Sequence, residues 1–225
     1  MEHGYRQASG PWVIETVVTG GEWQENCYIV QCLATGEQAV IDPGDDAERL
    51  IGLVDRTQGP LRQILLTHGH HDHVSGAEVL CRRYGLRCLL HPSDARILRQ
   101  APNMALRFGG KRMDPVQSYS FLDKSGVIPF AGREIAVIPT PGHTPGGVCF
   151  DFGSCAFPGD TILYRRAGRA DLPGGDEALL AASIEGIMER LGDDTVLFGG
   201  HGRPWTVGEA KAWWCSQRDV ALGSH

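Results

Sequence analysis

The sequence predicts a single α/β domain, and three observations support this prediction. Strand-like and helix-like segments mix throughout the 225 residues, with a similar content of each in both halves. No repeat, low-complexity tract or linker divides the chain. Apolar residues make up 42% and charged residues 21%, which is ordinary for a globular protein with a substantial core. We therefore expect residues 1–225 to form one domain.

The first third of the chain predicts two strands, a short third strand, a helix and a fourth strand. The β-rich segments "WVIETVV" and "NCYIVQCL" flank a Gly-Gly turn. "QAVIDPGD" is a short buried strand that ends at the turn beginning with Asp42. Residues 45–57 place apolar side chains at helical spacing, with acidic residues in the first turn. "LRQILLT" is then a buried strand that leads into a histidine cluster.

The remainder alternates helices and strands. "HVSGAEVLCRRYG" predicts a helix that ends at Gly85, and "RCLLHPSD" predicts a strand followed by a helix that starts at Pro92. Residues 101–120 have little periodicity, and we expect a mobile surface segment there. Further strands are expected in "GREIAVIPTPGHT", "GGVCFDFGSCAFPGD" and "TVLFGGHG", and further helices in "DEALLAASIEGIMERLG" and "TVGEAKAWWCSQRDVAL".

Composition argues against several classes of partner. The formal net charge of −6 disfavours nucleic acid, whose partners usually present basic patches. The apolar runs are too short to cross a bilayer, and "MEHGYRQASGPW" has no apolar region typical of a secretory signal. The seven cysteines form no CxxC pair, which fits reduced thiols. We expect a cytoplasmic protein with neither a membrane nor a nucleic-acid partner.

The segment "LLTHGHHDHVSG" concentrates histidine and aspartate at the end of a predicted strand. His68, His70, His71, Asp72 and His73 fall within six positions. Such side chains are costly to bury without partners, so packing does not explain them. Nitrogen and carboxylate donors at this density suit divalent cations, zinc above all. The pattern predicts a metal site, with a solvated histidine-rich loop as the alternative.

Three more donors follow other predicted strands. His143 lies in "PTPGHTPGG", Asp160 in "FPGDTIL" and His201 in "FGGHGRP", each in a Gly-rich turn. Strand ends that face one edge are where α/β folds collect their ligand sites. Together with the cluster, these residues place seven donors at the ends of four strands, which favours one shared metal site.

At these motifs the sequence resembles the metallo-β-lactamase fold superfamily, over about residues 12–210. "THGHHDH" is similar to its HxHxDH signature, and "PGHTPGG", "GDTIL" and "GGHG" are similar to its later motifs. The resemblance implies an αββα four-layer sandwich of mixed sheets flanked by helices, with the metal site on the edge between the sheets. "GDTILYRRAGRADLPGGD" resembles the glyoxalase II-like (hydroxyacylglutathione hydrolase-like) branch of short bacterial type, and persulfide dioxygenases share this segment.

The resemblance also implies which residues hold metal. They would form two groups that share one carboxylate: His68, His70 and His143 for a first ion, Asp72, His73 and His201 for a second, and Asp160 bridging both.

Other residues would support these ligands. His71 occupies the variable position of the signature and is expected at the surface or behind the ligands. Asp42 is expected to orient ligands by hydrogen bonds. Arg169 and Asp171 are expected to pair within their loop and fix its shape.

This ligand set predicts hydrolysis. Two divalent ions, zinc in the first place and iron or manganese as alternatives, would share a hydroxide that attacks an acyl carbon. Asp72 would act as the catalytic residue by orienting that hydroxide. We therefore expect a glyoxalase II-like thioesterase for a small-molecule acyl-thiol conjugate. Three alternatives stay open: a mononuclear iron persulfide dioxygenase using His68, His143 and Asp160; a lactonase or other ester hydrolase; and a metal-binding scaffold without turnover.

The substrate-binding residues are not predicted. Relatives with full glyoxalase II activity usually carry a C-terminal helical domain, whereas this sequence has room for one helix after "GHGRPW", which leaves glutathione as the carrier in doubt. Basic residues that could meet a carboxylate of the carrier are Arg107, Lys111, Arg112, Arg165, Arg166 and Arg169. The resemblance includes a homodimer as one oligomeric state.

Overall fold

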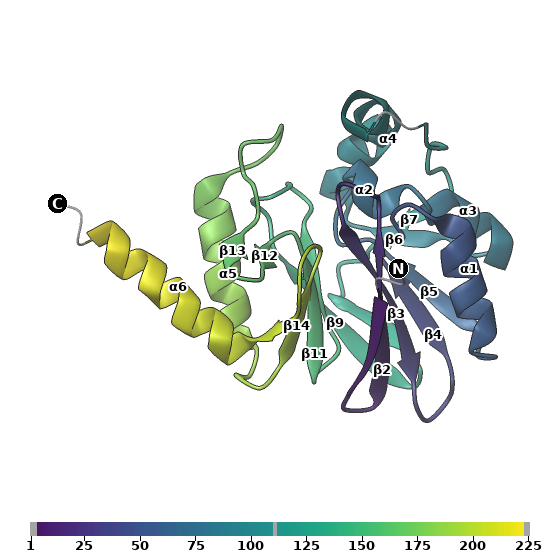
Figure 1. Ribbon diagram of the computed structural model, residues 1–225, viewed down its shortest axis with the longest axis horizontal. Helices are drawn as coiled ribbons and strands as arrows, with labels where there is room; N and C mark the ends of the chain where they lie inside the picture. Colours follow the sequence, from purple (N-terminus) through teal and green to yellow (C-terminus); the bar gives the residue numbers. More distant parts are fainter. Residues whose placement is uncertain (1–3, 110–111, 223–225) are drawn as a thin grey trace.

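In the computed structural model, which describes residues 4–109 and 112–222, two β-sheets pack face to face (Figure 1). Within these residues the first sheet has seven strands in chain order: β1 (Gly4–Ser9), β2 (Trp12–Thr19), β3 (Glu25–Cys32), β4 (Gln38–Ile41), β5 (Leu61–Leu65), β6 (Cys88–Leu90) and β7 (Tyr119–Phe121). The second sheet has six, in the order β15 (Trp205–Thr206), β14 (Val196–Gly199), β11 (Cys155–Gly159), β10 (Val148–Asp151), β9 (Arg133–Pro139) and β8 (Val127–Phe130).

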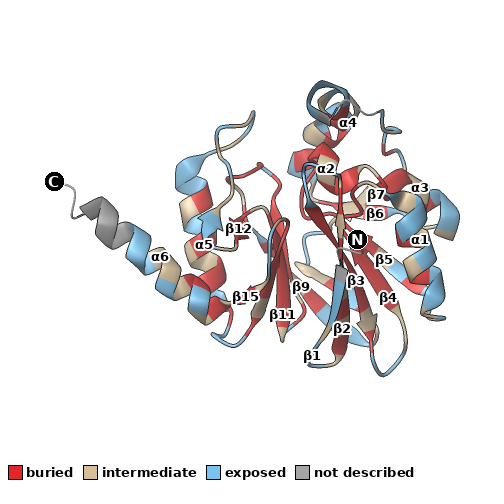
Figure 2. Cartoon of the chain, in the orientation of Figure 1, coloured by how far each residue is buried: buried red, intermediate tan, exposed pale blue. Residues whose placement is uncertain are grey.

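Side-chain alternation explains why the strands of the first sheet are buried on both faces. In β3, Cys27 and Ile29 point to one face, and Tyr28 and Val30 point to the other. The first pair packs against helices and the second pair against the second sheet. Figure 2 shows the resulting continuous burial through the centre of both sheets.

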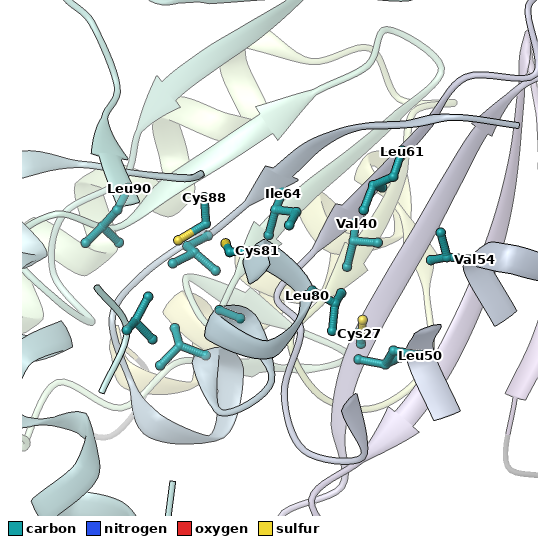
Figure 3. Packing of buried hydrophobic residues seen from close by; sticks show 14 of the residues in the cluster. Cys27, Val40, Leu50, Val54, Leu61, Ile64, Leu80, Cys81, Cys88 and Leu90 are labelled. Atoms are coloured by element: carbon teal, nitrogen blue, oxygen red, sulfur yellow. The ribbon is translucent and has the colours of Figure 1, made fainter. Parts of the chain in front are cut away.

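Helices cover the outer face of each sheet. Leu50 of α1 (Ala47–Arg56), Leu80 of α3 (Ala77–Tyr84) and Leu98 of α4 (Ala95–Met104) pack on the first sheet, as the close view in Figure 3 shows for the first two. Ile184 of α5 (Glu177–Arg190) and Ala210 of α6 (Val207–Leu222) pack on the second. The order of layers is α/β/β/α, which confirms the predicted sandwich.

Two local predictions need correction. The helix expected over residues 73–85 is divided by a turn at 75–76 into α2 (His71–Val74) and α3, although Gly85 ends it as predicted, with φ of 67°. The surface segment expected at 101–120 contains regular secondary structure in its described part. There α4 continues to Met104, a π-helical turn covers Ala105–Gly109, and β7 pairs with β6.

Burial explains the second correction. Pro102 lies inside α4 and removes one backbone donor, a change that normally disfavours a helix. Leu98, Ala101 and Ala105 are nevertheless buried against the body of the protein along one face of this helix. Their packing outweighs the lost hydrogen bond, and periodicity in the sequence did not reveal it.

The remaining elements lie near the sheet edge where the histidines gather. A 3₁₀ turn (Pro92–Asp94) precedes α4, and the hairpin of β12 (Ile162–Leu163) and β13 (Arg166–Ala167) follows β11.

All seven cysteines are free, and six of them are buried. Among residues 4–109 and 112–222, none of the helices has the length and apolar character needed to cross a membrane.

Candidate metal centre

The strand order brings the seven predicted donors to one edge of the sandwich. β4 and β5 run parallel in the first sheet, and β11 and β14 run parallel in the second. Because the carboxyl ends of parallel strands share an edge, the segments after these strands lie together. His68 and His70 follow β5, Asp160 follows β11, and His201 follows β14. His143 lies in the loop between β9 and β10.

Hydrogen bonds between the two sheets fix this edge. The Nδ2 group of Asn26 in β3 donates to the carbonyl oxygens of Gly199 and Gly202, at 3.0 and 2.8 Å. The hydroxyl of Tyr28 donates to the same Gly199 carbonyl at 2.5 Å. The end of β14, which carries His201, is thereby held against the start of β3.

The first donor group comprises His68, His70 and His143. One ligand atom from each of these histidines lies within 4.8 Å of the others. All three side chains are buried, and Nδ1 of His70 is 2.9 Å from Nε2 of His143. Nε2 of His68 is buried without a hydrogen-bond partner in the protein. A convergent set of imidazole nitrogens with an unpaired buried member fits a divalent metal ion.

The second donor group comprises Asp72, His73 and His201, whose ligand atoms also lie within 4.8 Å of one another. Oδ2 of Asp72 is 3.8 Å from Nε2 of His73 and 3.6 Å from Nε2 of His201. This group is closer to solvent than the first, because the side chain of His201 is 18% exposed and that of Asp72 is 11% exposed.

Asp160 lies between the two groups. Its Oδ2 is 3.7 Å from Nε2 of His143 in the first group and 3.5 Å from Nε2 of His201 in the second. Its Oδ1 is 3.6 Å from Nε2 of His73 and is buried without a hydrogen-bond partner. A Cβ atom at Gly200 would stand 2.2 Å from this Oδ1, so a larger residue there would force the carboxylate to shift. Asp160 is therefore placed where one carboxylate can serve two ions.

Hydrogen bonds behind the donors orient the imidazole rings of both groups. Nδ1 of His73 lies 3.0 Å from Oδ2 of Asp42, and the Thr67 hydroxyl donates to the same oxygen at 2.6 Å. Thr67 Oγ1 is also 3.0 Å from Nδ1 of His68. Because the hydroxyl proton is directed to Asp42, Nδ1–H of His68 donates to Thr67. Nε2 of each ring is thus left with its lone pair facing the centre.

Two backbone carbonyls do the same for the rings of His143 and His201. Nδ1 of His143 donates to the carbonyl oxygen of Arg169 at 2.7 Å, and Nδ1 of His201 donates to that of Gln24 at 3.2 Å. A carbonyl oxygen can only accept, so in each ring Nδ1 carries the proton and Nε2 is available to a metal.

Comparison with known proteins identifies the family. The sequence model of the metallo-β-lactamase superfamily matches residues 20–201. The chain belongs to the metallo-β-lactamase superfamily. Members bind divalent metal ions, and the two donor groups of this chain could hold such ions.

Proteins of this superfamily that are similar to the chain carry names of different activities. Hydroxyacylglutathione hydrolase GloC of Haemophilus influenzae is 33% identical over 193 residues, which cover 84% of this chain and 91% of that protein. The crystal structure of the B3 metallo-β-lactamase BLEG-1 has a TM-score of 0.79 at 30% identity and covers 88% of this chain and 96% of its own. The structure of TTHA1623 in a di-iron-bound form has a TM-score of 0.77 at 35% identity and covers 86% and 94%.

The two donor groups of this superfamily member differ in electrostatics. Burial, followed by the neighbouring imidazoles, lowers the pKa of His68 well below its usual value and that of His70 to about 3. Burial also acts on His73 and His201, but the Asp160 carboxylate and its aspartate neighbours outweigh it and raise both pKa values. The pKa of Asp160 is well below its usual value, because the nearby histidines outweigh the effect of burial.

Two buried carboxylates support the centre and were not predicted from the sequence. Asp94 accepts hydrogen bonds from the backbone N–H groups of Gly69, at 2.9 Å, and Gly146, at 2.6 Å. These glycines lie in the loops that carry the first group. Glu25 accepts from the Thr19 hydroxyl at 2.6 Å and lies 3.8 Å from Nδ1 of His73. Their signals in the sequence are weak, since Asp94 resembles an ordinary acid at a helix start and Glu25 begins a strand.

A cleft of about 360 Å³ opens over the donor groups. The β2–β3 loop contributes Trp23, the π-helical turn contributes Phe108, and the hairpin after β11 contributes Leu163 and Arg166. Arg169 also lines the cleft, and its side chain forms a bidentate pair with Asp171, with both contacts at 2.8 Å.

The structure gives positions for His71 and for most of the basic residues that the sequence indicated as possible contacts of the carrier. His71 is buried and packs edge-on against Trp23 with ring centroids 5.5 Å apart, so of the two positions expected for it the one at the surface is wrong. Arg107 lies over the ring of Phe108, and Arg165 lies over the ring of Tyr164, outside the cleft. Arg112 borders a neighbouring cavity, and Lys111 lies outside the described residues.

Proposed function

We propose that this protein is a binuclear metallohydrolase that cleaves thioesters in the manner of glyoxalase II. The observation that carries the proposal is the position of Asp160, within 3.7 Å of ligand atoms in both donor groups. In support, a relative at 33% identity is named hydroxyacylglutathione hydrolase. Zinc is the first candidate for both ions on donor chemistry, and the di-iron form of a 35% identical relative makes iron the second.

In this proposal the first group and Asp160 hold one ion, and the second group and Asp160 hold the other. A bound pair of divalent ions lowers the pKa of coordinated water and polarises a carbonyl group. The protein's own contribution is to keep the ligand nitrogens deprotonated and correctly oriented, through Asp42, Thr67 and the carbonyls behind the rings.

Asp72 is the proposed catalytic carboxylate. Its side chain lines the cleft and is 11% exposed, so substrate and water can reach it. From this position it can orient an attacking water molecule and accept its proton. The described residues that line the cleft include no serine, threonine, cysteine or lysine. Attack by water therefore fits this site better than attack by a side-chain nucleophile.

The cleft suggests an anionic thiol carrier. Arg166 and Arg169 both line it and have exposed side chains. Guanidinium groups pair readily with carboxylates, and thiol carriers such as glutathione contain carboxylates. We propose that these arginines face the carrier while the scissile carbonyl lies over the donor groups.

A thiol-release assay on a panel of acyl thioesters, with lactones beside them, tests this function. Protein loaded with two divalent ions should hydrolyse at least one thioester, chelation should abolish the activity, and added metal should restore it. Asp72→Asn should lower kcat by about 10²-fold or more. The matched control Asp123→Asn, at an exposed aspartate, should not change kcat. Fully loaded protein that hydrolyses no thioester would contradict the proposal.

A persulfide dioxygenase with one iron is the alternative that uses the same residues. His68, His143 and Asp160 supply the two-histidine, one-carboxylate set that suits such iron. The relative with a di-iron-bound structure gives iron chemistry a specific basis. Oxygen uptake that depends on a thiol persulfide, in protein with one iron per chain, would favour this alternative over hydrolysis.

A further inference from the structure

Basic residues concentrate in one segment of this acidic chain. Residues 95–113 contain five arginines and lysines and no aspartate or glutamate, although acidic residues outnumber basic ones by 27 to 21 in the whole sequence. The segment includes α4 and the π-helical turn that follows it. Figure 1 shows α4 at one end of the molecule, beyond the strands of the first sheet. A local positive charge on an acidic protein attracts anionic partners to that place on the surface.

Three arginines of this segment leave the same side of the helix. Arg96 and Arg99 of α4 are exposed, on the side opposite Leu98 and Ala101, which are buried. Arg107 follows Arg96 by eleven residues, or close to three helical turns, and is exposed as well. Arg96, Arg99 and Arg107, named here the arginine face, therefore extend over about 16 Å along the helix.

The arginine face has no carboxylate partner among the described residues. The neighbouring helix α3 differs in this respect. Its Arg82 pairs with Glu78 at 2.8 Å, and its Arg83 pairs with Asp55 at 2.9 Å. Guanidinium groups bind carboxylates readily and are enriched at protein interfaces. The arginine face is thus available to an anionic partner outside the chain.

Two large apolar side chains are exposed beside the arginine face. Leu106 is 57% exposed and Phe108 is 48% exposed, both in the π-helical turn. Apolar surface of this kind gains free energy when a partner covers it. Nucleic acid presents mainly phosphates to such a surface. A protein can offer acidic and apolar side chains together, so the mixed character of this region fits a protein partner better.

Helix α4 connects the arginine face with the metal centre. Its inner side packs on the loop between β5 and α2, where a Cβ atom at Gly69 would stand 2.9 Å from the backbone nitrogen of Leu98. Met104 and Phe108 line the cleft over the donor groups. A partner docked on the arginine face would therefore lie about one helix diameter, roughly 10 Å, from the cleft.

A small carrier does not account for the arginine face. None of its three side chains lines the cleft of about 360 Å³. A carrier that fits inside the cleft would instead contact Arg166 and Arg169, which do line it. A partner larger than the cleft can contact the arginine face and still insert a narrow arm between α4 and the donor groups.

We propose that the arginine face docks an acidic protein that carries the acyl group as a thioester on a flexible arm. Carboxylates of this partner lie opposite the three arginines, and its apolar side chains cover Leu106. The arm passes over Phe108 and delivers the thioester to the cleft. This inference rests on the proposed thioesterase function and names a class of carrier for the same site.

One acyl group on two carriers tests the docking. The substrates are the acetyl thioester of N-acetylcysteamine, which is small and uncharged, and that of an acidic acyl carrier protein. In 0.1 M salt, kcat/KM should be about tenfold or more higher for the protein carrier, because opposite charges speed association. In 1 M salt the advantage should vanish, since the screening length falls from about 10 Å to about 3 Å. A ratio that does not change with salt would overturn the proposal.

Charge reversal locates the docking site. Arg96→Glu and Arg99→Glu should each lower kcat/KM for the protein carrier by about fivefold in 0.1 M salt and leave that for N-acetylcysteamine unchanged. Arg190→Glu makes the same change at an exposed arginine in the last turn of α5 and should alter neither value. An equal effect of Arg190→Glu would overturn the assignment. Unchanged kcat/KM in both α4 variants, with normal thermal unfolding, would do so too.

Binding of the carrier protein without an acyl group separates this inference from the proposed function. Fluorescence anisotropy of the labelled carrier protein should show binding to the metal-loaded enzyme that Arg99→Glu weakens about fivefold. If this holds while no thioester is hydrolysed, the arginine face stands and the thioesterase function fails. If small thioesters are hydrolysed but the carrier protein does not bind, the function stands and the inference is overturned.

Phosphatidylglycerol vesicles and a DNA duplex test the two other kinds of anionic surface. Both should bind the enzyme at least about tenfold more weakly than the carrier protein does, because the rest of this acidic chain repels an extended anionic surface. Tighter binding of either one, lost in Arg99→Glu, would overturn the assignment of the arginine face to an acidic protein.

Discussion

The two donor groups lie side by side but differ in burial and in the pKa values of their histidines. The first group is fully buried, and burial together with neighbouring imidazoles keeps the pKa values of His68 and His70 low. The second group includes the partly exposed Asp72 and His201, and carboxylates raise the pKa values of His73 and His201. The first group is thus a neutral, enclosed set of nitrogens, and the second is an acidic set that faces the cleft.

This difference indicates a division of roles between the groups. A buried neutral group needs no proton release before it binds a cation, so it suits an ion held for stability. A group rich in carboxylates and open to the cleft suits the ion that meets water and substrate. Asp160 couples the two groups, because its carboxylate contacts both.

The largest expected effect comes from removal of that shared carboxylate. Asp160→Ala should lower metal content at both groups and lower kcat/KM by about 10³-fold or more, since several kcal/mol of charge stabilisation are lost. Elemental analysis and the thioester assay on one preparation check this. Unchanged metal content in the variant would show that the two groups do not share Asp160.

A second comparison separates the supports of the two groups. Asp42 contacts both, through Thr67 to His68 and directly to His73, whereas Asp94 contacts only loops of the first group. Asp42→Asn should weaken metal binding at both groups by about 10- to 100-fold. Asp94→Asn should weaken metal binding at the first group only. Competition titrations with a chromophoric chelator resolve the two steps. Equal effects of both variants on both steps would contradict the assigned supports.

The two donor groups should also differ in the pH at which they lose their metal ions. The raised pKa values of His73 and His201 mean that protons compete with metal in the second group at a higher pH than in the first, where His70 has a pKa of about 3. Below the raised pKa values, affinity of the second group should fall about tenfold per pH unit for each competing proton. Metal retained after dialysis between pH 8 and pH 5 should therefore fall from two ions to one. Simultaneous loss of both ions would contradict the comparison.

The smallest effect concerns Glu25, which lies behind the second group. Burial raises its pKa well above the usual value, so the folded, metal-free protein keeps this proton at a pH where the unfolded chain has lost it. Its contribution to stability is complete below the unfolded pKa and is lost as pH rises toward the folded value. Glu25→Gln mimics the protonated form at every pH. The free energy of unfolding of this variant, relative to that of the wild type, should therefore grow with pH by at most about 1.4 kcal/mol per unit.

Urea unfolding of chelated wild-type and Glu25→Gln protein at pH 4 and pH 8 measures this difference. Glu15→Gln, at a partly exposed carboxylate paired with Arg56, is the matched control and should show no comparable trend. A stability difference for Glu25→Gln that is the same at both pH values would contradict a raised pKa.

The sequence predicted the elements that have strong local signals. The β-rich composition of β2 and β3 and the helical spacing in α1 and α5 predicted these elements near their observed bounds. The short edge strands β1, β8 and β15 were missed, because an edge strand needs only partial alternation and takes its pairing from neighbours distant in sequence. The helix through Pro102 was missed because tertiary packing, which no local pattern reveals, stabilises it.

The same distinction holds for the site. The seven donors were predictable because each stands at a strand end in a dense or Gly-rich motif, and the structure places them together. The supports Asp94 and Glu25 were not predictable, since their partners Gly69, Gly146 and His73 are distant in sequence or are backbone groups. His71 packs against Trp23 of the β2–β3 loop, a contact between residues distant in sequence that a motif cannot show.

Metal content per chain tests the central claim of two coupled donor groups most directly. Tag-free protein, purified without chelator or added metal, is analysed for all divalent metals together with protein concentration. The account predicts close to two ions per chain in wild type and a lower content in Asp160→Ala. Close to one ion per chain, held as iron and accompanied by persulfide-dependent oxygen uptake, would contradict it.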